Sequence, residues 1–376
     1  MYKIIYPLSD ATIYSQFPER NTGMDQILEL GKSTEGAPSL EGDATVYYDS
    51  TYNSRILIKF DLADVSSSIV RGKIDSNTAT YYLNLKGTSA TSLPIQYDVY
   101  VFPVSSSWVN GTGYFGNDPQ VTNGASWYYR NGKLQTVKWA TSSYNSNSTG
   151  SFSTITGGGN WYTSSFSSQS FNHSDIDVRV NVTGIINRWL DGTFQNNGFI
   201  VKFPASVEQD DSILGNIQFY GKESHTIFIP KLEIYWNDVD FSGTSSISEV
   251  GQDDFVVHAK NMKSAYSDVE VAKVRLLVRE KYPQLSYATS SHYLNVKRFP
   301  TSSYFQIQDV VTDEIIVPFD TTGTKVNCDT TGNYLKLDCT SLMPERKYKL
   351  VFKTEWEGGD TVKLIDENMV FGIKRN

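Results

Sequence analysis

Apolar and polar residues alternate along several stretches of the first 240 residues. Between residues 55 and 62, the apolar side chains fall on one face of a strand and the charged ones on the other. The apolar face holds Ile56, Ile58, Phe60 and Leu62, and the charged face holds Arg55, Lys59 and Asp61. Residues 95–101, 198–203 and 230–236 alternate in the same way. A period of two predicts antiparallel strands with one buried and one solvated face.

One segment has helical periodicity instead. Thr183 is a candidate N-cap, and Gly192 a candidate stop. Between them an apolar stripe repeats at helical spacing, formed by Ile185, Ile186, Trp189 and Leu190. We expect this helix to close one end of a β-sandwich, and we expect the whole chain to contain at most two short helices.

Residues 105–170 differ in character, since Ser, Gly, Asn, Thr and aromatic residues replace the aliphatic runs. We interpret this region as long loops that elaborate the sandwich. Its aromatic residues have three alternative roles: a sugar-stacking platform, anchors of a protein interface, or side chains buried under the loops themselves. The candidates are Trp108, Tyr114, Trp127, Tyr128 and Tyr129.

A change of composition at residues 237–254, where Ser, Gly, Asp and Glu replace the hydrophobic residues, predicts a linker. Further strand patterns without helical periodicity follow it. The expected organisation is therefore all-β: a jelly-roll-like β-sandwich over 1–237 with elaborated loops at 105–170, a linker at 238–254, and an immunoglobulin- or fibronectin-like β-sandwich over 255–376.

Two local features of the second domain carry predictions of their own. Leu342, Pro344 and Tyr348 fit the tyrosine corner of immunoglobulin-like sandwiches, in which the hydroxyl binds upstream backbone. The alternative is an ordinary turn before a strand. Cys328 and Cys339, the two cysteines, flank a predicted hairpin in a register that does not bring them face to face, so we expect two free thiols.

Charge and hydropathy remove two classes of partner. The formal net charge is −8, the pI is near 5.1, and no run of Lys and Arg occurs, so we expect no nucleic-acid partner. No apolar run is long enough to span a bilayer. Pro7 and Asp10 interrupt the first apolar stretch before it could serve as a signal peptide, which favours assembly in a cytoplasm.

Motifs for catalysis are lacking, so we expect neither enzymatic activity nor a cofactor. Metal-type ligands alternate onto one face of a strand only at His173, Asp175 and Asp177, and a solvated strand edge is the preferred interpretation. The glycines at 157–159 follow no strand and precede no helix, so a flexible loop is preferred to a phosphate cradle.

Several segments between about residues 8 and 236 together resemble the DNRLRE family of jelly-roll-like sandwiches. They are residues 10–15, residues 54–62 (Ser-Arg-Ile-Leu-Ile-Lys-Phe-Asp-Leu), residues 182–202, and residues 219–235, which end in Pro-Lys-Leu-Glu-Ile-Tyr. The resemblance implies a non-catalytic sandwich of the kind found in carbohydrate-binding modules, cell-surface proteins and some phage particles.

Segments of the C-terminal part, including residues 289–293, 300–304, 313–320 and 342–348, resemble a module of uncharacterised tailed-bacteriophage structural proteins. The resemblance implies a non-enzymatic virion structural protein, assembled in the host cytoplasm. We expect an accessory of the head, portal, collar or neck that binds other virion subunits in symmetric copies. The alternative is a carbohydrate-binding or adhesion module of a cell-surface or secreted protein.

Overall fold

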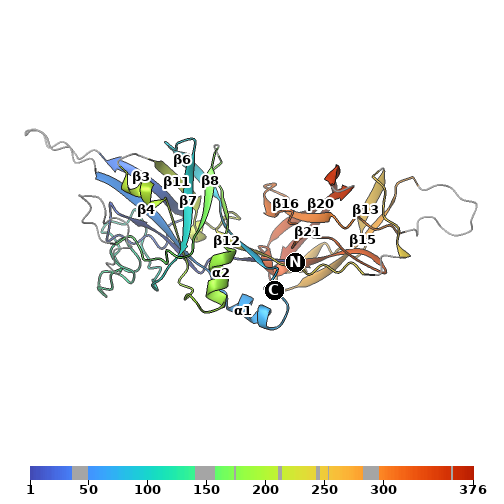
Figure 1. Cartoon of the computed structure of the whole chain (residues 1–376), viewed down its shortest axis with the longest axis horizontal. Helices are drawn as coiled ribbons and strands as arrows, with labels where there is room; N and C mark the ends of the chain where they lie inside the picture. Colours follow the sequence, from blue (N-terminus) through green and yellow to red (C-terminus); the bar gives the residue numbers. More distant parts are fainter. Residues whose placement is uncertain are drawn as a thin grey trace, which may run out of the picture. The chain divides into compact units, whose positions relative to one another are not determined.

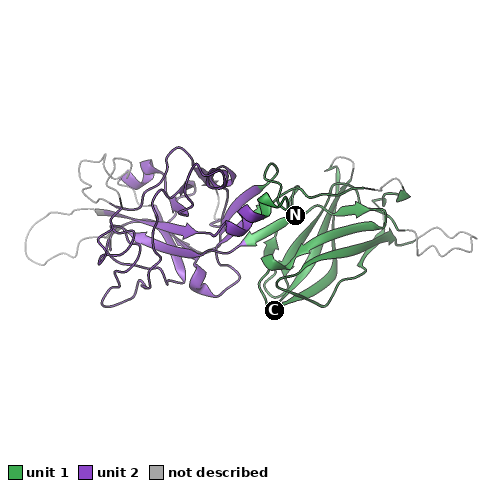
Figure 2. Cartoon of the chain, turned by 90° about the horizontal axis from the view of Figure 1, so that it is seen from below, with its two compact units in different colours: residues 1–4, 68–79, 234–376 green, residues 5–67, 80–233 purple. Residues whose placement is uncertain are grey.

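The computed structural model describes residues 1–35, 50–139, 157–172, 175–210, 214–242, 246–252, 254–282, 296–356 and 359–376. Within these residues the protein is built mainly of β-strands, as the alternating patterns predict (Figure 1). The chain forms two compact units (Figure 2). We call residues 5–67 and 80–233 the loop-covered unit, and residues 1–4, 68–79 and 234–376 the immunoglobulin-like unit.

A large sheet in the order β6-β11-β3-β4-β10-β7-β8 dominates the loop-covered unit, with β2 also paired to β4. Its strands are β2 (Ser9–Tyr14), β3 (Ile27–Glu35), β4 (Ser50–Lys59), β6 (Gly87–Thr91), β7 (Tyr97–Pro103), β8 (Ser167–Phe171), β10 (Phe199–Lys202) and β11 (Gly215–Tyr220). A second sheet has the order β1-β12-β5-β9, with β1 (Tyr2–Ile5), β12 (Lys231–Tyr235), β5 (Thr80–Leu85) and β9 (Val178–Asn181). Both β1 and β12 contain a position at which the chain passes from one unit to the other.

The described residues contain three α-helices, one more than the predicted maximum: α1 (Ala63–Val70), α2 (Thr183–Leu190) and α3 (Ala205–Gln209). A 3-10 turn, η1 (Lys222–Ser224), follows β11. Sequence periodicity missed α1 because its only buried side chain is Val65. Helix α2 lies where it was expected, but Val182 occupies the N-cap position, and the Thr183 hydroxyl instead accepts a hydrogen bond from the backbone of Tyr81 at 2.9 Å.

The immunoglobulin-like unit is a sandwich of two sheets, in the orders β13-β15-β19-β18 and β14-β21-β20-β16-β17. Its elements are β13 (Phe255–Ala259), β14 (Ala265–Ser267), β15 (Val271–Glu280), β16 (Ser303–Asp309), β17 (Ile315–Val317), β18 (Asn327–Asp329), β19 (Gly332–Asp338), the 3-10 turn η4 (Cys339–Ser341), β20 (Arg346–Trp356) and β21 (Thr361–Lys374). In chain order this is the A-B-E-D and G-F-C arrangement of immunoglobulin domains. The short β14 pairs with β21 in parallel, while the other strand pairs of this unit are antiparallel.

Both local predictions for this unit are confirmed. The Tyr348 hydroxyl donates to the backbone oxygen of Met343 at 3.0 Å, which is the bond of a tyrosine corner. Leu342, at the start of the motif, is buried. Cys328 and Cys339 are free thiols in the interior, and burial raises the pKa of both. Neither thiol is therefore activated for chemistry at neutral pH.

The predicted linker at 238–254 is wrong, because its described residues pack into the immunoglobulin-like unit. Phe241 forms a parallel bridge with Cys328, and the indole nitrogen of Trp356 donates to the backbone oxygen of Val250 at 3.1 Å. Val250 is itself buried. A segment rich in Ser, Gly and Asp looks flexible in sequence, but here its backbone groups bind β-strand backbone of the same unit.

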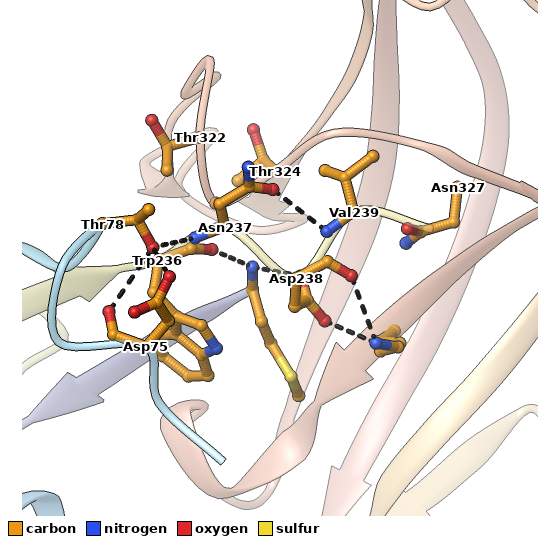
Figure 3. Close-up of polar contacts among 12 residues, drawn as sticks. Asp75, Thr78, Trp236, Asn237, Asp238, Val239, Thr322, Thr324 and Asn327 are labelled. Atoms are coloured by element: carbon orange, nitrogen blue, oxygen red, sulfur yellow. Dashed lines mark hydrogen bonds and ion pairs between the residues drawn. The ribbon is translucent and has the colours of Figure 1, made fainter. Parts of the chain in front are cut away.

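The start of that segment is held by a polar network (Figure 3). The backbone nitrogen of Asn237 donates to the Thr78 hydroxyl at 3.1 Å, and the Asp238 carboxylate lies 2.6 Å from the Lys336 ammonium. The nitrogen of Met1 lies 2.5 Å from the other carboxylate oxygen of Asp238. These contacts hold Asp238 ionised, and its pKa lies below the usual value although burial acts in the opposite direction.

Candidate functional site

The long loops cover the outer face of the large sheet and build a second core there. A hydrophobic cluster joins sheet residues such as Ile13, Leu57 and Ile200 to Trp108, Trp127 and Trp139 from the loops. The indole nitrogen of Trp108 donates to Asn197, and that of Trp139 to Ser126, each at 2.8 Å. Alternation would place this face of the sheet in solvent, but the loops bury its side chains, such as Leu57. The described loops elaborate the sandwich as expected.

The five aromatic candidates do not form one exposed platform. Trp127 is fully buried, Trp108 and Tyr129 are also buried, and Tyr128 is half-buried. Tyr114, with 46% of its surface exposed, is the one of the five that reaches solvent freely. Of the three alternative roles, burial under the loops describes Trp108, Trp127 and Tyr129. Their spacing in the sequence gave no sign of this, because the residues they cover lie far away along the chain.

Beside this core lies a cluster of buried charges, formed by Arg55 on β4, Lys202 on β10 and Glu208 on α3. The Arg55 guanidinium donates to both oxygens of the Glu208 carboxylate, at 2.9 and 2.7 Å. The Lys202 ammonium lies 2.6 Å from the second oxygen. Arg55 was expected on a wet face and is instead fully buried, because α3 and the loops cover this side of the sheet.

Aromatic rings and backbone oxygens complete the surroundings of these charges. The Arg55 guanidinium lies 4.7 Å from the Trp127 ring centroid and 5.2 Å from that of Trp161. It also donates to the backbone oxygen of Gly158 at 2.5 Å. Gly157, Gly158 and Gly159 all have positive φ and are buried, so this stretch is a fixed turn against Trp127 and not the expected flexible loop.

The ionisation of the cluster follows from its burial. Burial lowers the pKa of Lys202 to about 8, against the opposing effect of the Glu208 carboxylate. For Glu208, burial acts to raise the pKa, but the charges of Arg55 and Lys202 outweigh it and hold the pKa below the usual value. These side chains contact one another, backbone oxygens and aromatic rings. This geometry fits a structural tie that fixes α3 and the glycine turn to the sheet.

The next feature is the set of candidate metal ligands, His173, Asp175 and Asp177, of which the two aspartates bind groups of the protein. His173 lies outside the described residues. Asp175 accepts a hydrogen bond from the backbone of Asp177 at 3.0 Å, while the Asp177 carboxylate accepts from Gly87 and lies 2.7 Å from the Lys86 ammonium. Over the ranges that the structure describes, no group of three or more His, Cys, Asp or Glu side chains could hold a metal ion.

An open hollow of about 550 Å³ lies in the loop-covered unit. It is lined by Arg20, Phe115, Gly116, Asn117, Asp118 and Gln120. The Arg20 guanidinium lies 4.3 Å from the Phe17 ring centroid and 4.9 Å from that of Phe115, and it donates to the backbone oxygen of Phe115 at 3.0 Å. The hollow therefore combines an aromatic ring with several planar polar side chains.

Asn21 follows Arg20 of the lining and ties together loop segments next to the hollow, and the sequence analysis did not single it out. Its amide nitrogen donates to the backbone oxygens of Asn110 and Ala125 at 2.7 and 2.8 Å, and its amide oxygen accepts from Gly113 at 2.8 Å. A Cβ on Gly113 would meet the backbone of Asn21, so this position accepts only glycine without movement. One buried asparagine thus ties together both ends of the loop, which no local motif announces.

A second hollow, of about 350 Å³, lies in the immunoglobulin-like unit. It is lined by residues of β13, β15 and β21, among them Val257, His258, Arg279 and Met369. Neither hollow is lined by the buried charges around Glu208. Among the described residues, no helix is both long and apolar enough to cross a membrane.

Comparison with known proteins adds little. No protein-family model matches the sequence, and no curated protein matches it. Among solved structures, a DUF4785 family protein from Legionella pneumophila is similar at 7% sequence identity, with a TM-score of 0.18. The match covers 99% of this chain but only 62% of that protein, which is less than two thirds of its length. A likeness this distant carries no argument about fold or function.

Proposed function

We propose that this chain is a non-enzymatic structural protein of a bacteriophage particle, an accessory of the head, portal, collar or neck that binds neighbouring subunits. The observation that carries the proposal is the set of apolar side chains that the immunoglobulin-like unit exposes at its strand ends and on β21. Clustered exposed apolar residues are typical of protein interfaces. The resemblance of the C-terminal segments to a module of tailed-bacteriophage structural proteins supports this kind of particle, and the DNRLRE resemblance of the first domain is compatible with it.

Among the described residues of this unit, exposed apolar side chains lie at several separate places, and Val70 and Tyr282 are two of them. Three further places are the following. Val269 and Val271 flank the start of β15, with 63% and 55% of their surfaces exposed. Val311, at 81%, lies in the hairpin between β16 and β17. On β21, Val362 and Leu364 are 53% and 64% exposed and point to the same face, because residues two apart in a strand share a face.

The buried ionisable groups described above are engaged within the fold. The interior charges at Arg55, Lys202 and Glu208 bind one another, and the two thiols are buried with raised pKa values. An accessory of this kind would be present in symmetric copies, with the apolar side chains of the immunoglobulin-like unit inside the contacts.

The experiment replaces two exposed apolar residues of β21 by aspartate, in the double variant Val362→Asp/Leu364→Asp. We expect the variant protein to fold but to be lost from purified particles, whereas the wild-type chain is found by mass spectrometry at a fixed multiple of the particle symmetry. Leu134→Asp is the matched control, since Leu134 is 91% exposed in the other unit. Particles that lack the wild-type chain altogether would refute the proposal.

A further inference from the structure

We propose that the free edge of strand β13 binds the same edge of a second copy of this chain, in an antiparallel pair centred on Val257. This inference goes beyond the proposed function, which rests on other residues, and it does not depend on that function. Among the described residues, β13 is an edge strand of its sheet and pairs with β15 alone. The opposite edge of the sheet is covered, because the Cys328 nitrogen donates to the Asp240 backbone oxygen at 3.0 Å.

The hydrogen bonds between β13 and β15 determine which backbone groups face the free edge. At one end of β13, the Lys281 nitrogen donates to the Asp254 backbone oxygen at 2.9 Å. At the other end, the Lys260 nitrogen donates to the Arg275 backbone oxygen at 2.8 Å. Hydrogen-bonded and non-hydrogen-bonded pairs alternate along an antiparallel ladder. The odd-numbered residues of β13 therefore point their N–H and C=O groups away from β15.

The residues that face the free edge in this way are Phe255, Val257 and Ala259. Over the ranges that the structure describes, no hydrogen bond of the protein reaches their backbone nitrogen or oxygen atoms. Val257 has only 2% of its surface exposed, so water has little access to its backbone. Buried backbone groups are paired in the great majority of cases. A strand added at this edge would supply the missing partners.

The edge of β13 is also accessible and regular. The hollow of about 350 Å³ lies along it, lined by Val257 and His258 of β13 and by Glu367 and Met369 of β21. Edge strands are commonly protected from pairing with another chain by charged residues, prolines or β-bulges. The sequence of β13, Phe-Val-Val-His-Ala, contains no Lys, Arg, Asp, Glu or Pro, and its pairing with β15 has no bulge. Strand β13 is therefore open to a strand of another molecule.

A two-fold axis through Val257 makes the edge of β13 complementary to itself. The two copies of Val257 then lie opposite each other, and Phe255 lies opposite Ala259 of the second copy. Each outward N–H meets an outward C=O, because odd-numbered residues face odd-numbered residues across the axis. On the buried face, the large Phe255 side chain meets the small Ala259 side chain, so the two copies fit without a steric clash between large residues.

Charged residues flank β13 in an order that favours a second copy as the partner. The same axis places Asp254 of each copy opposite Lys260 of the other. Both side chains are exposed, and neither makes an ion pair within the described part of the chain. They would occupy a non-hydrogen-bonded pair, in which side chains approach closely and opposite charges stabilise the contact. A parallel pair in register would instead bring like charges together, so the charges also specify the antiparallel direction.

The test compares two charge reversals with their mixture, by sedimentation equilibrium of the full chain. The wild type should show a monomer–dimer equilibrium with a dissociation constant on the order of 10 µM. Asp254→Lys and Lys260→Asp should each weaken the dimer about tenfold or more, because like charges then face each other on both sides of the axis. An equimolar mixture of the two variants should dimerise as strongly as the wild type, because opposite charges again face each other between unlike copies.

Lys347→Asp is the matched control, since Lys347 is exposed on β20 in the other sheet of the same unit and its reversal should leave the dimer unchanged. Hydrogen exchange gives a second readout, because the amides of the odd-numbered residues of β13 should exchange more slowly as the dimer forms. Three results would overturn the inference. They are a wild-type chain that stays monomeric at about 1 mM, a mixture of the two reversed variants that does not dimerise, and a dimer in which these amides gain no protection.

Discussion

Strand β4 of the loop-covered unit and strand β15 of the immunoglobulin-like unit each carry an arginine that a run of apolar residues follows. In β4, the Arg55 side chain lies between the large sheet and the segments that cover it. It has no exposed surface and binds Glu208. In β15, the side chain of Arg275 is 26% exposed and pairs with Asp329 at 2.6 Å. Alternation therefore predicts the period of a strand. Residues far away in the sequence decide whether the second face of the strand is buried or exposed to solvent.

The energetic consequences of the two arrangements differ. A partly exposed ion pair is screened by water and contributes little to stability. A buried pair has lost its hydration, so removing one partner leaves a charge in the interior with nothing to compensate it. The two units thus offer the same chemistry in two dielectric environments, and substitutions can separate the two cases.

The largest effect is expected from Glu208→Gln, which leaves Arg55 and Lys202 as buried cations. We expect the free energy of unfolding of the loop-covered unit to fall by about 3 to 5 kcal/mol. Hydrogen exchange on the full chain in urea, resolved to peptides of each unit, measures this. A fall below about 1 kcal/mol would show that the cluster is hydrated and behaves like a surface pair.

A smaller effect, with a distinctive pH dependence, is expected from Asp10→Asn. Burial raises the pKa of Asp10 from the ordinary 3.8 of an aspartate to about 7, although the backbone of Lys222 donates to the carboxylate at 2.6 Å. Because the folded state holds this proton more tightly, the contribution of Asp10 is complete below pH 3.8 and is lost as the pH rises through about 7. The asparagine should therefore stabilise the unit at pH 8 by about 2 kcal/mol and have little effect at pH 4.

The contribution of Asp329 to the stability of the immunoglobulin-like unit has the opposite pH dependence. The hydrogen bond from Arg275 is the main cause that holds the pKa of Asp329 below its usual value, so its contribution is present at neutral pH and lost on acidification. Urea titrations at pH 2, 3, 4, 6 and 8 compare the two groups, because the contribution of Asp329 falls only below pH 3.8, whereas that of Asp10 changes between pH 4 and 8. An Asp10→Asn variant whose stability gain does not change with pH would contradict the assignment of a raised pKa.

Tyr348→Phe tests the tyrosine corner at a smaller scale. Loss of the bond to the Met343 backbone oxygen should lower the stability of the immunoglobulin-like unit by about 1 kcal/mol, the net contribution of an ordinary hydrogen bond. Tyr282→Phe is the control, because Tyr282 is 71% exposed in the same unit. Equal unfolding midpoints for the two variants would show that the corner hydroxyl is dispensable.

The smallest effect is expected from Asp329→Asn, the partner of the Glu208 substitution in this comparison. The side chain of Asp329 is 20% exposed, and that of Lys273, its second partner, is 45% exposed. We expect a loss below about 1 kcal/mol, measured by the same exchange experiment. A loss as large as that of Glu208→Gln would mean that exposure does not control the strength of these pairs.

Local signals in the sequence were sufficient where the structure is decided locally. The strand around Arg55, helix α2 between Thr183 and Leu190, and the corner at Tyr348 each depend on residues close together in the chain. The separation of Cys328 from Cys339 by hairpin register was predictable for the same reason.

Features that depend on distant partners were not predictable in this way. The burial of Arg55 requires Glu208, 153 residues away, and the loop around the hollow requires Asn21, 92 residues from Gly113. The segment after Trp236 looked like a linker because its composition is polar, yet the strand that it pairs with begins at Asn327. Of the five aromatic candidates, Tyr114 is the most exposed, and it precedes Phe115 of the hollow, which the sequence analysis did not single out.

The discontinuity of the immunoglobulin-like unit has a consequence for synthesis on the ribosome. Residues 1–4 and 68–79 emerge early, but the strands that complete this unit follow residue 234. Glu233, the last residue of the loop-covered unit, lies in β12. The ribosome therefore completes this unit before it makes strands β13 to β21 of the immunoglobulin-like unit. Residues 1–4 and 68–79 therefore lack their partners in the immunoglobulin-like unit while the loop-covered unit folds. The order of translation makes the immunoglobulin-like unit the last of the two to fold.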